Sequence, residues 1–138
     1  MNPITILIAE DHPEMRAGLL TLLSSERDFQ VVGQAENGRQ AVAFASKYCP
    51  DIVIMDITMP LIDGLEATRH IMETTPSTRV LVLSSHSDDA YVDKARALGA
   101  AGYLVKQADA KRLPEAIRSV HAGGAFVNPT KPTHPVTP

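Results

Sequence analysis

The sequence predicts an α/β fold in which a doubly wound, five-stranded parallel sheet carries helices on both faces. Short apolar runs alternate with stretches whose apolar residues recur every three or four positions, as in repeated βα units. Turn residues such as Asn37-Gly38 and Asp63-Gly64 separate the two kinds of segment. The length of 138 residues suits one domain with right-handed crossovers between its strands.

Five apolar runs have the length and composition of strands. They are Ile4–Ala9, Gln30–Gln34, Ile52–Met55, Val80–Leu83 and Gly102–Val105. The run Ile52–Met55 contains no polar residue, which is typical of a central parallel strand covered by helices on both faces. A segment with helical spacing follows each run, so we expect helices rather than hairpins to join the strands.

Each predicted helix presents its apolar residues along one face. These faces are formed by Met15, Leu19, Leu22 and Leu23, by Ala41, Phe44, Ala45 and Tyr48, by Ala67, Ile71 and Met72, by Tyr91, Ala95 and Leu98, and by Leu113, Ile117 and Val120. Ser87 is expected to cap the fourth helix, with Asp88 and Asp89 in its first turn. The fifth helix is expected to end at Gly123-Gly124.

The alternating pattern ends at Ala125. The residues beyond it are rich in proline, with Thr and His between Pro129, Pro132, Pro135 and Pro138. Such a composition is typical of an extended or disordered linker. We therefore divide the chain into a domain over residues 1–124 and a linker over residues 125–138, and expect a further domain to follow.

Composition and charge argue against several classes of protein. The net charge of −3 and the lack of a visible basic patch argue against binding of nucleic acid by these residues. The apolar runs are far shorter than the roughly 20 residues of a membrane helix, and the N-terminus does not resemble a signal peptide. The single cysteine, Cys49, excludes an intramolecular disulfide. We therefore expect a cytoplasmic protein without a membrane partner.

Ionisable or hydroxyl side chains directly follow or end four of the predicted strands. In chain order they are Glu10 and Asp11, Asp56, Ser84, and Lys106. Ligands gather at the carboxyl ends of parallel strands, so we expect one crevice with three carboxylates, a hydroxyl and an ammonium. Asp11 by itself could equally be the N-cap of the first helix. Four strand ends with complementary chemistry nevertheless indicate a site.

This set of groups suits a divalent cation. Mg²⁺ prefers oxygen ligands and usually takes one or two carboxylates from a protein. Asp11 and Asp56 could bind it directly, with Glu10 binding directly or through water. A backbone carbonyl just after Asp56, such as that of Thr58, could complete the protein's share.

The same groups suit phosphoryl transfer. The Asp56 carboxylate could attack a phosphoryl donor and form an aspartyl phosphate. Catalysis of such a transfer depends mainly on positioning and on neutralising the phosphoryl oxygens. The cation and Lys106 would neutralise that charge, and Ser84 would donate a hydrogen bond. His12, beside the acidic pair, is expected to be a neutral residue that opens the first helix.

Together these residues resemble the receiver domain of bacterial two-component response regulators. The resemblance covers about Ile4 to Ala122 and rests on Glu10-Asp11, Asp56, Met59-Pro60, Asp63-Gly64, Ser84 and Gly102-Tyr103-Leu104-Val105-Lys106. The stretches Ile8–Pro13 and Asp63–Arg69 are similar to the NarL/FixJ (LuxR-type) branch. Gln107 stands where many other receivers have proline, and this departure fits the branch. The resemblance implies a flavodoxin-like sheet with the strand order 2-1-3-4-5.

The resemblance also implies the phosphoacceptor and the metal ligands. Asp56 would accept the phosphoryl group from the phosphohistidine of a histidine kinase. Mg²⁺ would be held by Glu10, Asp11, Asp56 and the Thr58 carbonyl, and Lys106 would bind the phosphate.

Three further residues have implied roles in switching and in the lifetime of the phosphoryl group. Ser84 and Tyr103 would be the switch pair, in which Ser84 moves toward the phosphate and Tyr103 changes between outward and inward rotamers. Thr58 and His86 would tune the lifetime of the acyl phosphate, with more effect on autodephosphorylation than on phosphorylation. The fourth helix, fifth strand and fifth helix would report the change.

The implied output is a conformational change rather than a product, so no multiple-turnover enzyme is expected. The implied partners are a cognate histidine kinase and a homodimer formed on phosphorylation. Members of the branch usually carry a C-terminal helix-turn-helix domain, and DNA would be bound only through such a domain outside these residues.

Three other functions share this architecture. A pseudo-receiver binds partners without phosphorylation, and the complete set of site residues argues against it. A phosphatase of the haloacid dehalogenase type has a second aspartate two positions after its nucleophile, where this chain has Thr58. A nucleotide- or flavin-binding domain would need a glycine-rich phosphate loop after the first strand, where this chain has Glu10-Asp11-His12-Pro13.

Overall fold

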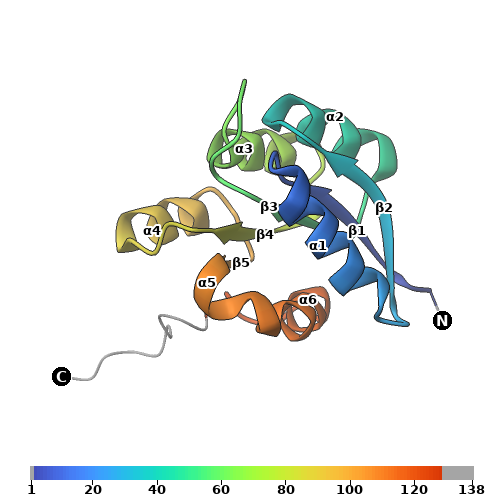
Figure 1. Cartoon of the computed structure of the whole chain (residues 1–138). Helices are drawn as coiled ribbons and strands as arrows, with labels where there is room; N and C mark the ends of the chain where they lie inside the picture. The colour runs from blue at the N-terminus through green and yellow to red at the C-terminus, as the bar shows by residue number, and fades with distance from the viewer. Residues whose placement is uncertain (1, 129–138) are drawn as a thin grey trace.

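The computed structural model describes residues 2–128 and contains a five-stranded sheet in which all neighbouring strands are parallel. The strand order is β2-β1-β3-β4-β5, which confirms the predicted order. Helices lie on both faces of the sheet (Figure 1). The predicted doubly wound α/β architecture is therefore correct.

The strands are close to the predicted runs. They are β1 (Ile4–Ala9), β2 (Phe29–Ala35), β3 (Ile52–Met55), β4 (Arg79–Ser84) and β5 (Gly102–Val105). Three strands have the predicted bounds, while β2 and β4 are one residue longer at each end. Pairing accounts for the extra residues, since Phe29 pairs with Ile4 and Ser84 pairs with Val105. Backbone hydrogen bonds thus extend a strand beyond its apolar run.

The helices include one short element that the sequence did not reveal. They are α1 (Pro13–Ser24), α2 (Gly38–Tyr48), α3 (Gly64–Thr74), α4 (Asp89–Ala97), α5 (Lys106–Asp109) and α6 (Leu113–His121), with a 3₁₀ turn at Ala110–Arg112. The single turn α5 is tied to β5 because the Asp109 carboxylate accepts the backbone N–H of Val105 at 2.9 Å. No helix within residues 2–128 is long and apolar enough to cross a bilayer.

Two apolar cores lie on the two faces of the sheet. One packs α2, α3 and α4 against the sheet, and the other packs α1 and α6. Successive residues of β1 alternate between them, with Leu7 in the first core and Ile6 and Ile8 in the second. All four residues of β3 are buried, as predicted for a strand covered on both faces.

The start of α4 differs from the prediction. Asp88 rather than Ser87 is the N-cap, and Asp89 is the first helical residue. The Asp88 carbonyl accepts the first helical hydrogen bonds, from the backbone N–H groups of Tyr91 (3.1 Å) and Val92 (3.2 Å). The Asp88 side chain forms no capping hydrogen bond, so its backbone carbonyl marks this boundary. Ser87, Asp88 and Asp89 are all good N-cap residues, so the sequence alone does not show which of them caps the helix.

Only residues 125–128 of the predicted linker belong to the described part of the chain, and residues 129–138 lie outside it. Val127 pairs with Gly102. The Val127 N–H donates to the carbonyl of Ala101 (3.2 Å), and the Val127 carbonyl accepts the N–H of Tyr103 (2.7 Å). This short segment therefore lies along β5, the last strand of the sheet.

Candidate functional site

The carboxyl edge of the sheet holds Asp56 and Glu10 side by side. The Asp56 N–H donates to the carbonyl of Ala9 at the end of β1, and the Glu10 N–H donates to Ala35 at the end of β2, both at 3.0 Å. These bonds continue the sheet ladder past the strand ends and hold both backbones in place. Both residues are buried, with exposed fractions of 3% for Asp56 and 1% for Glu10.

Lys106 reaches these carboxylates from the start of α5. Its Nζ lies 2.9 Å from Glu10 Oε1 and 3.5 Å from Asp56 Oδ1. The ammonium therefore bridges two buried carboxylates that would otherwise repel one another. The structure thus brings together groups that follow the first, third and fifth strands of the chain.

The acidic groups fit a divalent cation. Glu10, Asp11, His12 and Asp56 each offer one ligand atom, and these atoms lie within 4.8 Å of one another. Asp11 Oδ1 and Asp56 Oδ2 are buried and accept no hydrogen bond within the described residues. A buried carboxylate oxygen that accepts no hydrogen bond is unfavourable, and a cation could contact both atoms. The carboxylate-rich donor set is one that Mg²⁺ prefers.

The buried environment shifts the pKa values of the site's charged residues in different directions. Burial and then the negative charge of Glu10 raise the pKa of Asp56 to about 6, against the opposing effect of Lys106. Burial also disfavours the charged form of Glu10, but hydrogen bonds from Lys106 and His12 outweigh it and hold its pKa below the usual value. Lys106 is partly desolvated, yet the two carboxylates outweigh this and raise its pKa. Asp56 is therefore the carboxylate whose ionisation is least favourable.

His12 is a neighbour of the site that sequence reasoning did not include. It is the N-cap of α1, so it opens the first helix as predicted and Asp11 does not. Its Nδ1 lies 3.0 Å from Glu10 Oε2 and 3.2 Å from Asp11 Oδ1. The hydrogen bond to Glu10 and the charge of Asp11 raise the pKa of His12 above its usual value. The position of His12 directly after Glu10 and Asp11 in the sequence could have indicated that it lies beside the site.

The predicted switch residues are connected through the backbone of His86. Tyr103 is fully buried, and its hydroxyl donates to the carbonyl of His86 at 2.7 Å. The His86 N–H donates to Ser84 Oγ at 3.1 Å. Tyr103 therefore has an inward position, and the loop after β4 links it to Ser84. Burial raises the pKa of the Tyr103 hydroxyl above its usual value.

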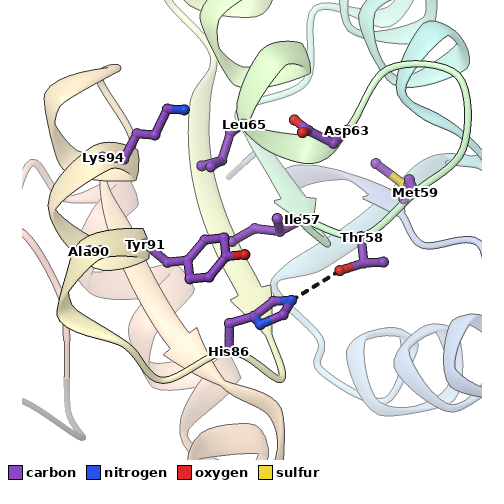
Figure 2. A pocket seen from close by; sticks show the side chains of 9 residues that line it. All are labelled: Ile57, Thr58, Met59, Asp63, Leu65, His86, Ala90, Tyr91 and Lys94. Atoms are coloured by element: carbon purple, nitrogen blue, oxygen red, sulfur yellow. Dashed lines mark hydrogen bonds between the residues drawn. The ribbon is translucent and has the colours of Figure 1, made fainter.

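A cavity of about 460 Å³ lies between α4 and the loop that follows Asp56. Its lining residues are Ile57, Thr58, Met59, Asp63, Leu65, His86, Ala90, Tyr91 and Lys94 (Figure 2). His86 Nε2 and Thr58 Oγ1 are 3.2 Å apart in a hydrogen bond. The His86 ring also stacks on Tyr91, with ring centroids 4.4 Å apart and planes at 22°. Sequence reasoning missed this stack, because the helical spacing of Tyr91 indicates only a residue on the packed face of α4.

Comparison with protein families and curated proteins gives a consistent result. The family model "Response regulator receiver domain" matches residues 6–118. The transcriptional regulatory protein DegU of Brevibacillus brevis is 45% identical over 133 residues, covering 96% of this chain and 56% of that protein. The response regulator UvrY of Escherichia coli is 38% identical over 124 residues, covering 90% of this chain and 57% of that protein. The chain thus spans just over half the length of these curated relatives.

Solved structures give the same result. A LuxR-family two-component response regulator from Aurantimonas sp. SI85-9A1 has a TM-score of 0.88 and 34% identity, covering 94% of this chain and 92% of that chain. The signal receiver domain of NarL from Mycobacterium tuberculosis has a TM-score of 0.85 and 30% identity, covering 89% of this chain and 99% of that chain. Each likeness extends over most of both chains.

Proposed function

The chain belongs to the response regulator receiver family, in the branch of the NarL and LuxR-type regulators, and from this we propose that Asp56 is its phosphoacceptor. Membership makes it the receiver domain of a two-component response regulator and not a multiple-turnover enzyme. The observation that carries the proposal is the environment of the buried Asp56 carboxylate. One oxygen lies 3.5 Å from Lys106 Nζ, and the other accepts no hydrogen bond within the described residues.

The proposed donor is the phosphohistidine of a cognate histidine kinase. The Asp56 carboxylate forms the new bond to phosphorus while the bond from phosphorus to the donor nitrogen breaks, and the electron pair of that bond returns to the imidazole. Lys106 faces the phosphoryl oxygens, and Ser84 donates a hydrogen bond to one of them. With a pKa of about 6, Asp56 is mostly ionised and nucleophilic at neutral pH.

Mg²⁺ is the proposed cofactor, held by Glu10, Asp11, Asp56 and the backbone carbonyl of Thr58. Two observations support it: the buried carboxylate oxygens that accept no hydrogen bond, and the close spacing of the acidic groups. When bound, the ion supplies positive charge that offsets the carboxylates and the phosphoryl oxygens. Glu10 keeps its charge for this role, because Lys106 and His12 hold its pKa low.

The proposed switch acts through the loop after β4. Ser84 Oγ accepts the N–H of His86, and Tyr103 donates to the carbonyl of the same residue. A Ser84 hydroxyl that turns to the phosphoryl group must rearrange this loop and with it the partner of Tyr103. The phosphoryl group shifts the populations of the two arrangements by its preference for one of them. We expect α4, β5 and α6, the fifth helix predicted from the sequence, to report the change. We expect Thr58 and His86 to tune the lifetime of the aspartyl phosphate.

The proposed output of the whole protein is control of transcription. The DegU relative is named a transcriptional regulatory protein, and this chain matches just over half of it. We expect DNA binding to reside in a domain outside residues 1–138, and a homodimer to form on phosphorylation. The isolated chain, with a net charge of −3, is expected not to bind duplex DNA.

Intact-mass measurement tests the phosphoacceptor. The chain is incubated with Mg²⁺ and acetyl phosphate or phosphoramidate, alongside Asp56→Ala and the control Asp63→Asn. Asp63 is an exposed residue of the same loop, and asparagine caps α3 equally well. A phosphate-sized mass gain is expected in the native chain and the control, but not in Asp56→Ala or with EDTA. A folded native chain that gains no mass from either donor would instead be a pseudo-receiver.

A further inference from the structure

Tyr91 makes a contact that takes no part in the proposed phosphoryl transfer. Its ring, on the first turn of α4, stacks on the His86 ring at 4.4 Å, and His86 Nε2 lies 3.2 Å from Thr58 Oγ1. A continuous line of contacts therefore runs from α4 to the loop after β3 (Figure 2). We call Thr58, His86 and Tyr91 the clasp.

The clasp joins the loops that follow β3 and β4. Thr58 follows Asp56 by two residues and His86 follows Ser84 by two. Asp56 and Ser84 stand at the ends of β3 and β4, which are neighbours in the sheet. The hydrogen bond between Thr58 and His86 therefore crosses the gap between two loops that flank Asp56. Thr58 is exposed and His86 half-buried, while Asp56 is buried.

Stacking on Tyr91 holds the His86 ring more firmly than the hydrogen bond to Thr58 does alone. A single hydrogen bond to an exposed hydroxyl competes with water and holds an imidazole weakly. A stacked aromatic neighbour fixes both the position and the tilt of the ring. Tyr91 comes from α4, so the His86 ring is held from a second element and not only by its own loop.

We propose that Tyr91 is a positioning residue for hydrolysis of the aspartyl phosphate: it holds the His86 ring against Thr58 and so shields phosphorus from water. This inference rests on the proposed function, since it requires a phosphoryl group on Asp56. In the hydrolysis a water oxygen bonds to phosphorus, the bond from phosphorus to the Asp56 oxygen breaks, and its electron pair returns to the carboxylate. The water proton passes to solvent. In-line attack comes from the side of phosphorus opposite Asp56, and the proposal requires the clasp to lie across that approach.

Decay of the phosphorylated chain tests this role. The chain is loaded with Mg²⁺ and phosphoramidate, the donor is removed, and loss of phosphate is followed by intact mass. Tyr91→Ala is expected to raise the hydrolysis rate constant about three- to tenfold, the range that loss of one aromatic stack corresponds to. Its phosphorylation rate is expected to change less. Tyr91→Phe keeps the ring and is expected to decay at the native rate.

Coupling to His86 distinguishes positioning from a general loosening of α4. The double variant Tyr91→Ala with His86→Ala is expected to decay no faster than His86→Ala alone, because Tyr91 acts only through that ring. Ala90→Gly is the matched control, since it weakens the same helix beside the same cavity but keeps both rings. Its decay is expected to stay native.

Three results would overturn the inference while leaving the proposed function intact: a native decay rate in Tyr91→Ala, additive effects in the double variant, or equal acceleration in Ala90→Gly. A native chain that takes up no phosphate would overturn the proposed function itself, and this inference with it. The uptake step and the decay step therefore separate the two failures.

Discussion

The buried Asp56 carboxylate lowers the stability of the folded chain when it is ionised. This carboxylate is buried next to Glu10, and Lys106 lies 3.5 Å from one of its oxygens. Burial and the neighbouring charge raise its pKa to about 6, so its ionised form destabilises the folded chain. A proton, a cation or a phosphoryl group with its cation would each relieve this repulsion.

Asp56→Asn is therefore expected to stabilise the chain at neutral pH. Because the folded-state pKa lies above the unfolded one, the folded state binds more protons between about pH 4 and 6, and the native free energy of unfolding falls as pH rises through that window. Asparagine cannot ionise, so in EDTA the variant is expected to be more stable at pH 7 by roughly 1 to 2 kcal/mol, allowing for partial solvent screening. Urea unfolding measures the difference.

The gain from Asp56→Asn is expected to vanish below pH 4, where the native carboxyl is protonated in both states. Asp63→Asn, in the same loop but exposed, is the control and is expected to unfold like the native chain. A gain that persists at low pH would contradict the electrostatic explanation.

At the scale of elements, the junction of β3 and α3 leaves no space for a side chain. Asp63 caps α3 by accepting the N–H of Glu66 at 2.9 Å, and Gly64 follows as the first helical residue. A Cβ on Gly64 would stand 2.0 Å from the carbonyl oxygen of Asp56. The helix start thus packs directly on the backbone of Asp56, and this close approach requires glycine.

Gly64→Ala is expected to lower the free energy of unfolding by more than about 2 kcal/mol, since backbone and not a flexible side chain must move. It is also expected to slow phosphorylation, because the displaced backbone carries Asp56. Gly18→Ala is the matched control: nothing lies within 4 Å of its Cβ, and it stands within α1. That change should stabilise the chain by roughly 0.5 to 1 kcal/mol through helix propensity. If Gly64→Ala had the same thermal unfolding midpoint as the native chain, the packing argument would be wrong.

At the scale of the whole molecule, the site joins elements that are distant in the chain. Glu10 and Asp11 follow β1, Asp56 follows β3, and Lys106 begins α5. A site that binds one ligand through all these groups exists only in the folded chain, because the unfolded chain does not assemble them. Binding at this edge should therefore stabilise the whole domain.

Mg²⁺ is expected to raise the free energy of unfolding by about 1.4 kcal/mol at ten times its dissociation constant. EDTA should reverse the effect, and Asp11→Asn should weaken it because one carboxylate ligand is lost. Asp93→Asn removes an exposed carboxylate on α4 and should leave the Mg²⁺ response unchanged. Unfolding midpoints over a Mg²⁺ titration measure this. An equal response in Asp11→Asn would place the cation elsewhere.

The sequence by itself determined the architecture and the composition of the site. Buried parallel strands are continuous apolar runs, and this local pattern gave three of the five strands with their full bounds. Parallel topology then requires the strand ends to share one edge, which is why the sequence alone groups Glu10, Asp56 and Lys106. Both inferences depend on residue order alone.

Tertiary structure decided the features that depend on packing between distant segments. The N-cap at Asp88, the pairing of Val127 beside β5 and the stack of Tyr91 on His86 all follow from how neighbouring elements meet. The raised pKa of Asp56 and its oxygen without a donor follow from burial. Burial and contact are properties of the assembled fold, since they depend on which atoms exclude water from a group. A linear pattern of residue types does not contain that information.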